Sequence, residues 1–486
     1  MINNNKNIEQ DILGSQNKAV TRIRNNNAAE FNNTGKNKLY HIVTYGCQLN
    51  NADSEILSGF LNEMGFVNTN NINESDLIIF NTCCVRENAE LKLYGNIGAL
   101  KNLKKSKPEM IIAVCGCMMQ QKHSVDTIKS KYKHIDLIFG TNNIHVFPEL
   151  LEKIINKKST IIEIIDSESS IVEGLPVIRK DKHKAWVTIM YGCNNFCSYC
   201  IVPYVRGRER SRRPQNIIEE VKNLALDSYK EVTLLGQNVN SYGKDFFEPY
   251  DFADLLQDIN DIDGIERIRF MTSHPKDITD KLIHTIKDCN KICEHLHLPF
   301  QAGSNKILKL MNRKYTKEEY LYKIEKIKEA LPDIALTTDI IVGFPGETKE
   351  DFKETLDIVK KVQFDQAFTF IYSKRKGTPA FKMKDYMTKE EKHRNFDELI
   401  EIQNEISKKI NDTYIGKTVE VLVDGISKNN LNRYTGRTRT GKIVNFSGEN
   451  NLPGELVSVK IKEAYSWYLG GELNDTKSYS NDETIF

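Results

Sequence analysis

The strongest constraint on the fold of this chain is a repeated alternation of short apolar runs with amphipathic segments of helical length, which begins near Leu39. Alternation of this kind predicts parallel strands joined by helical crossovers, so we expect an α/β protein. The first expected strands cover residues 39–46, 77–82, 110–114 and 135–139. Helical patterns at 54–64 and 87–104 lie between them, which predicts a parallel α/β sheet domain.

A second and longer alternation supplies expected strands at residues 185–191, 231–235, 267–272, 295–300, 335–342 and 367–372. Six successive β/α units favour a partial (β/α)6 barrel, in which chemistry takes place at the carboxyl ends of the strands. Beyond Tyr414 the pattern changes to expected strands at 419–423, 437–444 and 456–461, joined by turns that contain Gly and Asn. These strands predict a small all-β barrel at the C-terminus.

The 486 residues of the chain exceed the length of one ordinary domain. The start is rich in asparagine and has little apolar periodicity, which predicts a disordered tail. We expect this tail at 1–37, the sheet domain at 38–157, a linker at 158–183, the barrel domain at 184–412, the β domain at 413–477 and a second tail at 478–486.

The charges of the chain are nearly balanced, with 68 Lys and Arg against 66 Asp and Glu, so any contact with a nucleic acid must be local. No apolar run is long enough for a membrane span, and the start lacks the apolar core of a signal peptide. We therefore expect a cytoplasmic protein with no membrane partner. Ten cysteines in such a protein are metal ligands, redox thiols or core residues rather than a disulfide framework.

Cys193, Cys197 and Cys200 form a C-x-x-x-C-x-x-C run directly after the first expected barrel strand. Three thiolates this close can bind one face of a metal centre. A structural zinc ion takes four ligands and an iron–sulfur cluster usually takes four thiolates, so three thiolates would leave one iron open to another molecule. A zinc site completed from a distant segment is the alternative.

A second trio of cysteines is scattered along the first domain, where Cys47, Cys83 and Cys117 each follow an expected strand. The carboxyl ends of neighbouring parallel strands converge, so these thiols can meet, although each alone could be a buried core residue. Cys84 and Cys115 compete with them as ligands, and the sequence pattern does not choose among the five.

Cys289 and Cys293 are spaced i, i+4 near His295 and His297, which is compatible with a zinc site. The segment leads into an expected barrel strand rather than into a zinc knuckle. We therefore favour core packing for both cysteines.

Several segments carry a family resemblance. Residues 191–200, with their C-x-x-x-C-x-aromatic-C run, resemble the radical S-adenosylmethionine (SAM) enzymes. Residues 44–50, 81–89 and 116–120 resemble the methylthiotransferase branch of these enzymes, and the resemblance extends from Lys38 to about Gly471. The stretches similar to the branch members that act on isopentenyl-adenosine in tRNA are 206–212, 297–301 and 364–380.

The resemblance implies two [4Fe-4S] clusters, and it sets Cys84 and Cys115 aside because they fall where the family tolerates other residues. It also implies that 38–157 is the methylthiotransferase domain, 184–412 the radical SAM domain and 413–477 a TRAM domain that binds RNA. The implied ligands are Cys193, Cys197 and Cys200 for the radical SAM cluster and Cys47, Cys83 and Cys117 for an auxiliary cluster.

The implied reaction converts N6-(dimethylallyl)adenosine beside the tRNA anticodon to its 2-methylthio derivative. It consumes two SAM molecules, one as the methyl donor and one as the source of a 5′-deoxyadenosyl radical. The implied partners are the tRNA anticodon loop and an electron donor such as flavodoxin or ferredoxin. The alternatives are a methylthiotransferase for threonylcarbamoyl-adenosine in tRNA or for a ribosomal protein and, from another class, a zinc-stabilised RNA-binding protein without catalysis.

The resemblance also indicates a SAM pocket, because the family uses the segment 339–347 against the adenine of SAM. Glycines there allow a close approach of the backbone to a ligand, but glycines in β/α turns also serve packing alone. The expected SAM-pocket residues are Tyr199, Gln237, Ser273, Gly343, Phe344 and Gly346.

Cationic side chains of the C-terminal barrel and of the loop after Cys200 are candidate RNA contacts. Barrels of this kind hold single strands by neutralising phosphates and stacking bases, and Tyr434 and Phe446 offer aromatic faces. A solvated charged surface is the alternative. The candidates are Arg206, Arg208, Lys428, Arg433, Arg437, Arg439 and Lys442.

Overall fold

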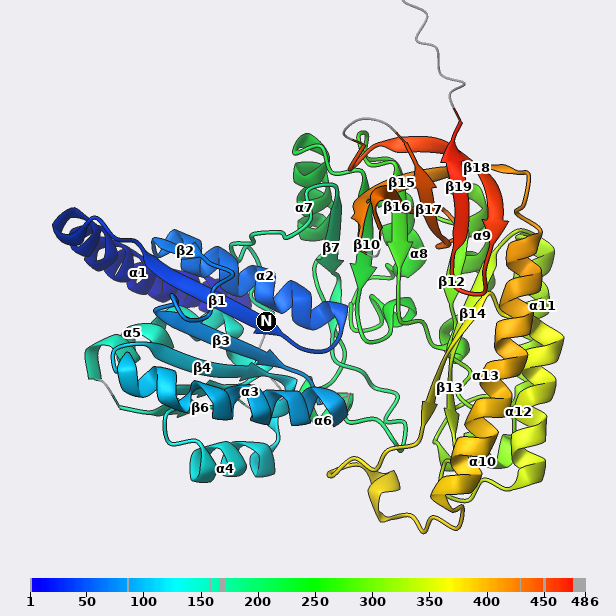
Figure 1. Cartoon of the computed structure of the whole chain (residues 1–486), viewed down its shortest axis with the longest axis horizontal. Helices are drawn as coiled ribbons and strands as arrows, with labels where there is room; N and C mark the ends of the chain where they lie inside the picture. Colours follow the sequence, from blue (N-terminus) through cyan, green and yellow to red (C-terminus); the bar gives the residue numbers. More distant parts are fainter. Residues whose placement is uncertain are drawn as a thin grey trace, which may run out of the picture.

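The computed structural model describes residues 2–84, 87–157, 159–165, 171–428, 430–448 and 452–474, which form three lobes. A six-stranded sheet domain lies beside an open partial barrel, and a small closed barrel covers one end of the partial barrel (Figure 1). The α/β class and the three architectures expected from the sequence are confirmed. Within the described ranges, no helix has both the length and the apolar character needed to cross a membrane.

The sheet domain is built on a parallel sheet in the order β2-β1-β3-β4-β5-β6. Every residue of β3 is buried, as expected of a parallel strand covered on both faces. Leu77 and Ile79 pack with α2 and α5, whereas Ile78 and Phe80 pack with α3 and α4. The bounds are β1 (Lys38–Thr44), α2 (Gln48–Glu63), β2 (Phe66–Asn68), β3 (Leu77–Thr82), α3 (Glu87–Ser106), β4 (Ile111–Gly116), η1 (Cys117–Gln120), α4 (Lys122–Lys131), β5 (Leu137–Phe139), η2 (Thr141–Val146), α5 (Phe147–Lys157) and β6 (Ile161–Glu163).

The edge strands β2 and β6 were not expected, because three residues are too few to show a sequence period. β6 pairs in parallel with β5 and falls inside the expected linker at 158–183. The first part of that segment therefore continues the sheet, which corrects the interpretation of the whole segment as a linker.

The start of the chain forms one helix, α1 (Ile2–Thr34), which corrects the expectation of a disordered tail at 1–37. Ala19, Val20 and Ile23 are buried where α1 lies along α5. Arg22 forms an ion pair at 2.5 Å with Glu152 of α5. The asparagine-rich composition concealed a narrow apolar stripe with i, i+3 and i+4 spacing, and tertiary packing of that stripe stabilises a helix of modest propensity.

The second lobe is a partial barrel of two three-stranded parallel sheets, β7-β10-β11 and β12-β13-β14. A parallel bridge between Ile268 and Ile292 joins them, while β7 and β14 stand at the outer ends and leave the barrel open. All six expected strands are present, and one apolar core lies between them and the outer helices. The strand bounds are β7 (Lys184–Thr188), β8 (Met190–Tyr191), β9 (Arg210–Ser211), β10 (Glu231–Leu235), β11 (Arg267–Phe270), β12 (His295–His297), β13 (Ala335–Val342) and β14 (Gln366–Ile371).

The main helices of this lobe come after strands in the sequence and pack against the outside of the partial barrel. Capping boxes at Thr316, Thr348 and Thr388 fix the starts of α11, α12 and α13. The bounds are α6 (Val202–Val205), α7 (Pro214–Leu226), η3 (Val239–Ser241), α8 (Phe252–Asn260), η4 (Pro275–Asp277), α9 (Asp280–Asp288), α10 (Asn305–Leu310), α11 (Lys317–Ala330), α12 (Lys349–Val362), η5 (Pro379–Lys382) and α13 (Lys389–Asp412).

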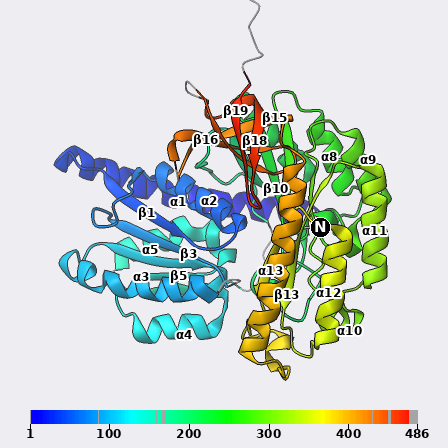
Figure 2. The ribbon, with the colours of Figure 1, turned by 45° about the vertical axis from the view of Figure 1, so that its right-hand side comes forward.

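The third lobe is a closed barrel in the order β15-β16-β17-β19-β18. The expected strand 437–444 is two strands, because the chain turns at Gly441, where φ is +80°. This lobe lies over the amino ends of the partial-barrel strands (Figure 2), where Arg267 of β11 donates to the carbonyl oxygen of Arg437 at 2.8 Å. The bounds are β15 (Thr418–Ser427), β16 (Asn430–Thr438), β17 (Ile443–Ser447), β18 (Leu456–Ala464) and β19 (Leu469–Leu473).

Candidate active site

Three cysteines of the sheet domain meet at the carboxyl edge of its sheet. Cys47 precedes α2 after β1, Cys83 follows β3, and Cys117 follows β4, and these three strands are neighbours. Asn50 Oδ1 lies 3.5 Å from Cys47 Sγ and 3.8 Å from Cys117 Sγ. A thiol hydrogen bond joins Cys83 to Cys47. The structure therefore brings together the second cysteine trio expected from the sequence.

Two glycines permit this close approach. A Cβ atom on Gly46 would lie 2.3 Å from the Cβ atom of Cys83, and one on Gly116 would lie 2.4 Å from the carbonyl oxygen of Thr82. Both glycines also have left-handed backbone angles, with φ of 113° and 95°. A side chain at either position would push apart the strand ends that carry the cysteines.

Hydrogen bonding and burial divide the thiols of this region into two groups. The hydrogen bond with Cys83 lowers the pKa of Cys47 to about 6. Hydrogen bonding with Cys84 lowers the pKa of Cys117, and the same contact raises the pKa of Cys84 well above its usual value. Burial in the apolar core raises the pKa of Cys115. The lowered pKa of Cys47 favours its thiolate, which is the form that binds iron, and the pKa of Cys117 is shifted in the same direction.

A buried polar network beneath these thiols was missed in the sequence. Asn50 is fully buried, and its Nδ2 donates to the carbonyl oxygen of Thr82 at 2.8 Å. Asn81 Nδ2 donates in turn to the carbonyl oxygen of Asn50 at 2.8 Å and to Ser54 Oγ at 2.9 Å. The network fixes α2 against β3 and so positions Cys47. Its one sequence signal is that Asn50 ends the segment 44–50 that carries the family resemblance.

The other cysteine trio lies on the loop between β8 and α6 of the partial barrel. The amide of Cys200 donates to the carbonyl oxygen of Cys197 at 2.9 Å, and Cys193 donates to that of Gly207 at 3.1 Å. The tight turn between them passes through Phe196, whose φ is 47°. Burial and, to a smaller extent, repulsion from neighbouring thiolates raise the pKa values of Cys193 and Cys200.

A buried arginine lies beside this loop. Arg313 Nη1 is 3.5 Å from Cys197 Sγ, and its Nε donates to the hydroxyl oxygen of Tyr315 at 3.0 Å. Burial is the main reason that the pKa is raised to about 11 for Cys193 and to about 12 for Cys200. These two thiols therefore stay protonated at neutral pH until a metal binds to the sulfur and displaces the proton.

The expected SAM pocket contains polar atoms that have no partner among the described residues. These are both amide atoms of Gln237 and the hydroxyl oxygen of Ser273, which follow β10 and β11 at their carboxyl ends. Buried polar groups of this kind normally form hydrogen bonds, so a polar ligand such as SAM fits the position. Tyr199 packs edge to face on Phe344, with 6.4 Å between ring centroids, and forms an aromatic wall next to Cys200.

The two glycines expected in this pocket have a packing explanation. Gly343 and Gly346 have φ of 71° and 91°, which favours glycine at both positions. A Cβ atom on Gly343 would lie 2.6 Å from side-chain atoms of Lys392 in α13, and one on Gly346 would lie 3.0 Å from Leu310. Chain packing therefore accounts for both glycines without a ligand.

Arg206 was expected to contact RNA, and the structure corrects this, because only 4% of the residue is exposed. Its Nη2 lies 2.7 Å from Asp53 Oδ2 and its Nε donates to Cys117 Sγ at 3.1 Å, so it reaches from the partial barrel into the sheet domain. The chain from Cys200 to Arg206 can span at most about 20 Å. One short segment therefore links the two cysteine trios.

Two further candidate RNA contacts are corrected to contacts between lobes. Arg439 forms an ion pair with Glu294 at 2.7 Å, and Lys442 forms one with Asp365 at 2.5 Å. Glu294 and Asp365 belong to the partial barrel, and Lys442 is only 8% exposed. Both cations connect the C-terminal barrel to the partial barrel; Lys442 is buried, whereas Arg439 is half-buried.

The remaining candidate cations stay available to a nucleic acid. Arg208, Lys428 and Arg437 are exposed, and Arg433 is half-buried. Arg437 lies 4.0 Å from the carboxylate of Asp424, at the limit of an ion pair. Of the two expected aromatic faces, Phe446 is fully buried in the barrel core, which corrects its assignment, whereas Tyr434 is half-buried.

A zinc site would need four side chains that converge on one ion. Among the described residues, no group of three or more His, Cys, Asp or Glu side chains is close enough for this. An iron–sulfur cluster is bound by several thiolates through different iron atoms, so this criterion for a single ion does not describe it. His295 and His297 hydrogen-bond to Thr337 Oγ1 at 3.1 Å and 3.0 Å, and Cys289 and Cys293 are buried, which favours core packing of that segment.

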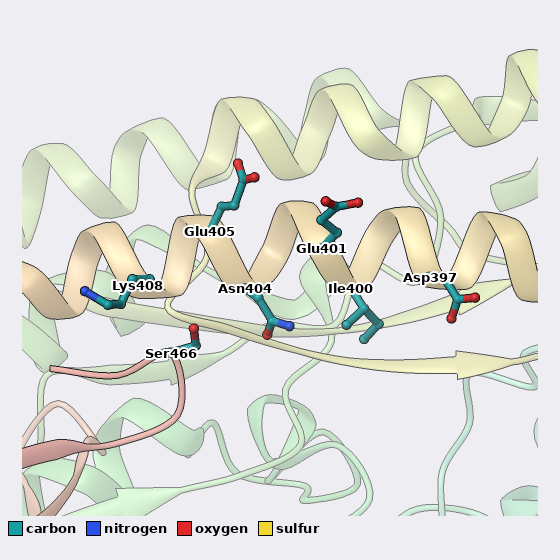
Figure 3. A pocket seen from close by; sticks show the side chains of 7 residues that line it. All are labelled: Asp397, Ile400, Glu401, Asn404, Glu405, Lys408 and Ser466. Atoms are coloured by element: carbon teal, nitrogen blue, oxygen red, sulfur yellow. The ribbon is translucent and has the colours of Figure 1, made fainter.

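An open groove of about 560 Å³ runs along α13, but it lies outside the candidate site (Figure 3). Its lining combines carboxylates with Lys408 of α13 and Ser466 of the loop before β19, and it contains no cysteine. The carboxylates would repel an anionic partner such as RNA. Those that line it are Asp397, Glu401 and Glu405.

Three family models match consecutive parts of the chain. Residues 39–140 match the family described as uncharacterized protein family UPF0004, and residues 187–359 match the radical SAM superfamily. Residues 412–473 match the TRAM domain. The three models correspond to the sheet domain, the partial barrel and the closed barrel.

Solved structures support the fold. The chain is similar to the radical S-adenosylmethionine methyltransferase TsrM from Kitasatospora setae, solved with cobalamin and a [4Fe-4S] cluster, with a TM-score of 0.52 and 13% identity over 71% of this chain and 77% of that one. A second TsrM structure, with tryptophan and a SAM analogue, gives a TM-score of 0.51 and 12% identity over 80% and 79% of the two chains. At this identity the likeness concerns the fold alone.

Curated relatives are far more similar. The chain is 58% identical to the tRNA-2-methylthio-N(6)-dimethylallyladenosine synthase of Acetivibrio thermocellus, over 96% of this chain and 97% of that protein. Proteins with the same name from Alkaliphilus oremlandii and Clostridioides difficile are 60% and 56% identical, over 91% and 95% of this chain and 94% and 97% of theirs. The chain therefore belongs to the tRNA-2-methylthio-N(6)-dimethylallyladenosine synthase family of radical SAM enzymes.

Proposed function

We propose that this enzyme converts N6-(dimethylallyl)adenosine beside the tRNA anticodon to its 2-methylthio derivative, with two SAM molecules and two [4Fe-4S] clusters. The names of the relatives and the TRAM match support tRNA as the substrate. The observation that carries the proposal is the single segment from Cys200 to Arg206, which joins a cysteine trio of the radical SAM lobe to one of the sheet domain.

The proposal assigns one cluster to each lobe. Cys193, Cys197 and Cys200 would hold the radical SAM cluster, and Cys47, Cys83 and Cys117 the auxiliary cluster. When bound, such clusters supply one-electron cleavage of SAM on one side and hold the sulfur to be transferred on the other. No acid or base residue is needed in this scheme, so the protein contributes position and the exclusion of water.

The surrounding side chains would orient SAM and the substrate base. Gln237 and Ser273 would hydrogen-bond to the polar part of SAM, since their buried polar atoms have no other partner among the described residues. Tyr199 and Phe344 would shield the cluster loop from water. Cys84 and Cys115 would remain neutral core thiols beside the auxiliary site.

The tRNA would lie across the interface of the lobes, and the C-terminal barrel would contact the sugar-phosphate backbone of the tRNA. Arg208, Lys428, Arg433 and Arg437 are the cations that support this placement. The proposal assigns these roles to the sheet domain of residues 38–157 together with β6, to the radical SAM domain at 184–412 and to the TRAM domain at 413–477. It includes a cytoplasmic location and an electron donor of the flavodoxin or ferredoxin type.

Two measurements test the proposed function. Anaerobically prepared protein should contain about eight iron per chain, the content of two four-iron clusters. Zinc without iron would instead favour the RNA-binding protein without catalysis. Nucleoside mass spectrometry of tRNA from a deletion strain should show loss of 2-methylthio-N6-dimethylallyladenosine, restored by this chain. Loss of a nucleoside that lacks the dimethylallyl group would make the proposed substrate wrong.

A further inference from the structure

We propose that Arg206 is a positioning residue that sets the reduction potential of the auxiliary cluster, and that Asp53 opposes its effect. The inference rests on the proposed function, since it takes Cys47, Cys83 and Cys117 as the ligands of that cluster. It assigns to both residues a role in the electronics of the site where the transferred sulfur would be held.

The contacts of Arg206 place its positive charge next to one proposed ligand, Cys117. Nε donates to Cys117 Sγ at 3.1 Å, while Nη2 lies 3.3 Å from Asn50 Oδ1 and 2.7 Å from Asp53 Oδ2. The side chains of Arg206 and Asp53 are each only 5% exposed, so water screens the charges little. A guanidinium group keeps its proton in proteins, so the positive charge at Cys117 is permanent.

The position of Arg206 is fixed by packing. Its amide donates to the carbonyl oxygen of Val202 at 2.8 Å and thereby closes α6. Ile201 and Val205 are buried in the same apolar cluster as Cys117, so α6 is docked on the sheet domain although it belongs to the radical SAM lobe. Asp53 is held by a second partner, Thr141, whose hydroxyl donates to Oδ2 at 3.2 Å.

The two charges act on the cluster with opposite signs. A cluster bound by thiolates becomes more negative on reduction, so a nearby positive charge and a hydrogen bond to a ligand sulfur both raise its reduction potential. Loss of the Arg206 charge removes both effects and leaves Asp53 uncompensated, which lowers the potential. Loss of the Asp53 charge leaves the guanidinium uncompensated, which raises it.

A structural role alone predicts a different result. If the Arg206–Asp53 pair served only to hold the lobes together, either substitution would loosen the same interface and change the potential in the same direction or not at all. Arg179 provides a matched control at that interface. It lies 3.6 Å from Glu55 of α2, and it donates to Glu220 Oε1 at 2.6 Å and to the carbonyl oxygen of Trp186 at 2.7 Å. Its side chain is 9% exposed, against 5% for Arg206.

The test uses the full chain with Cys193, Cys197 and Cys200 all replaced by Ala, so that only the auxiliary cluster assembles. Redox titration followed by electron paramagnetic resonance gives the potential. Arg206→Gln should lower the reduction potential by at least about 59 mV, which for one electron is a tenfold change in the ratio of reduced to oxidised cluster. Asp53→Asn should raise it, Arg206→Lys should fall between Arg206→Gln and the parent, and Arg179→Gln should match the parent.

The outcomes separate this inference from the proposed function. A parent protein without iron would make the proposed ligand set wrong. A parent with about four iron and equal potentials in Arg206→Gln, Asp53→Asn and Arg179→Gln would overturn the role of Arg206 alone. If Arg206→Gln fails to assemble a cluster, Asp53→Asn decides, because an unchanged or lower potential in that variant would also overturn the inference.

Discussion

Arg313 lies with Nη1 3.5 Å from Sγ of Cys197, in the same kind of contact that Arg206 makes with Cys117 at 3.1 Å in the other lobe. The two arginines come from unrelated segments, after α10 and after α6. Each cysteine trio therefore has one buried guanidinium group beside one member. Three thiolates in a desolvated site carry negative charge that burial penalises, and one fixed cation per trio offsets part of that cost.

Removal of a cysteine from one trio should abolish the cluster of that lobe and leave the cluster of the other lobe in place. Cys197→Ala removes a ligand of the radical SAM lobe and should abolish SAM cleavage, yet leave about four iron per chain in the sheet domain. Cys83→Ala should remove the auxiliary cluster while SAM cleavage continues without product. Iron analysis and assay of 5′-deoxyadenosine measure the two effects. Equal loss of both activities in both variants, with folding intact, would contradict the division between lobes.

Cys84→Ala is the matched control for the auxiliary ligand. Cys84 is adjacent to Cys83, and its hydrogen bond with Cys117 and its burial raise the pKa of its thiol. The family resemblance sets this position aside as a ligand. The variant should retain its iron and its product. Behaviour like that of Cys83→Ala would show that the assignment of Cys83 as the ligand is wrong.

The thiols of the two lobes should differ in their pH dependence before iron is loaded. The pKa of Cys47 is lowered to about 6, so its reactive thiolate is present above that pH and is lost as the pH falls through it. The pKa of Cys200 is raised to about 12, so this thiol stays protonated at neutral pH. Both residues are half-buried, which makes their accessibility comparable.

Alkylation of the iron-free full chain, followed by mass spectrometry, measures this difference. The labelling rate of Cys47 should rise through about pH 6 and level off by about pH 8, whereas that of Cys200 should still be rising at the highest pH tested. The comparison uses the pH profile rather than the absolute rate, so partial burial does not affect it. Profiles with one shared midpoint near the usual thiol pKa would contradict the assigned difference.

The sequence predicted most strands of the three parallel sheets because short segments rich in apolar residues lie between turns, as β3, β10 and β13 show. It placed Cys47, Cys83 and Cys117 at one edge because parallel strand ends converge. It missed Asn50 and Asp53, since their roles arise from contacts between segments that no local pattern reports. The same reason explains why Arg206, Arg439 and Lys442 were interpreted as surface cations.

The helix α1 offers a test of local packing. Ile23 is 2% exposed and packs in the core of the sheet domain, so Ile23→Ala should cost about 2–5 kcal/mol in the docking of α1. Hydrogen exchange of peptides from α1 should become faster in this variant. Asn26→Ala, at an exposed position of the same helix, should leave the exchange unchanged. Equal exchange in the two variants would mean that the apolar stripe does not hold α1 in place.

The cations of the C-terminal barrel should separate into RNA contacts and lobe contacts. Lys428 is exposed, so Lys428→Ala should weaken binding of a tRNA anticodon stem-loop and reduce the salt dependence of binding by about one counterion. Lys442 is buried and paired with Asp365, so Lys442→Ala leaves a carboxylate without its partner and should cost about 3–5 kcal/mol in stability. Its effect on the salt dependence should be negligible.

Fluorescence anisotropy over a range of salt concentrations and thermal unfolding distinguish the two roles. The double variant Lys442→Ala with Asp365→Ala removes both charges of the pair and should recover part of the lost stability, because the uncompensated carboxylate is gone. Lys428→Ala should unfold like the parent protein. If Lys442→Ala reduces the salt dependence of RNA binding and leaves stability unchanged, Lys442 contacts RNA and the assigned role is wrong. If Lys428→Ala leaves the salt dependence unchanged, Lys428 does not contact RNA.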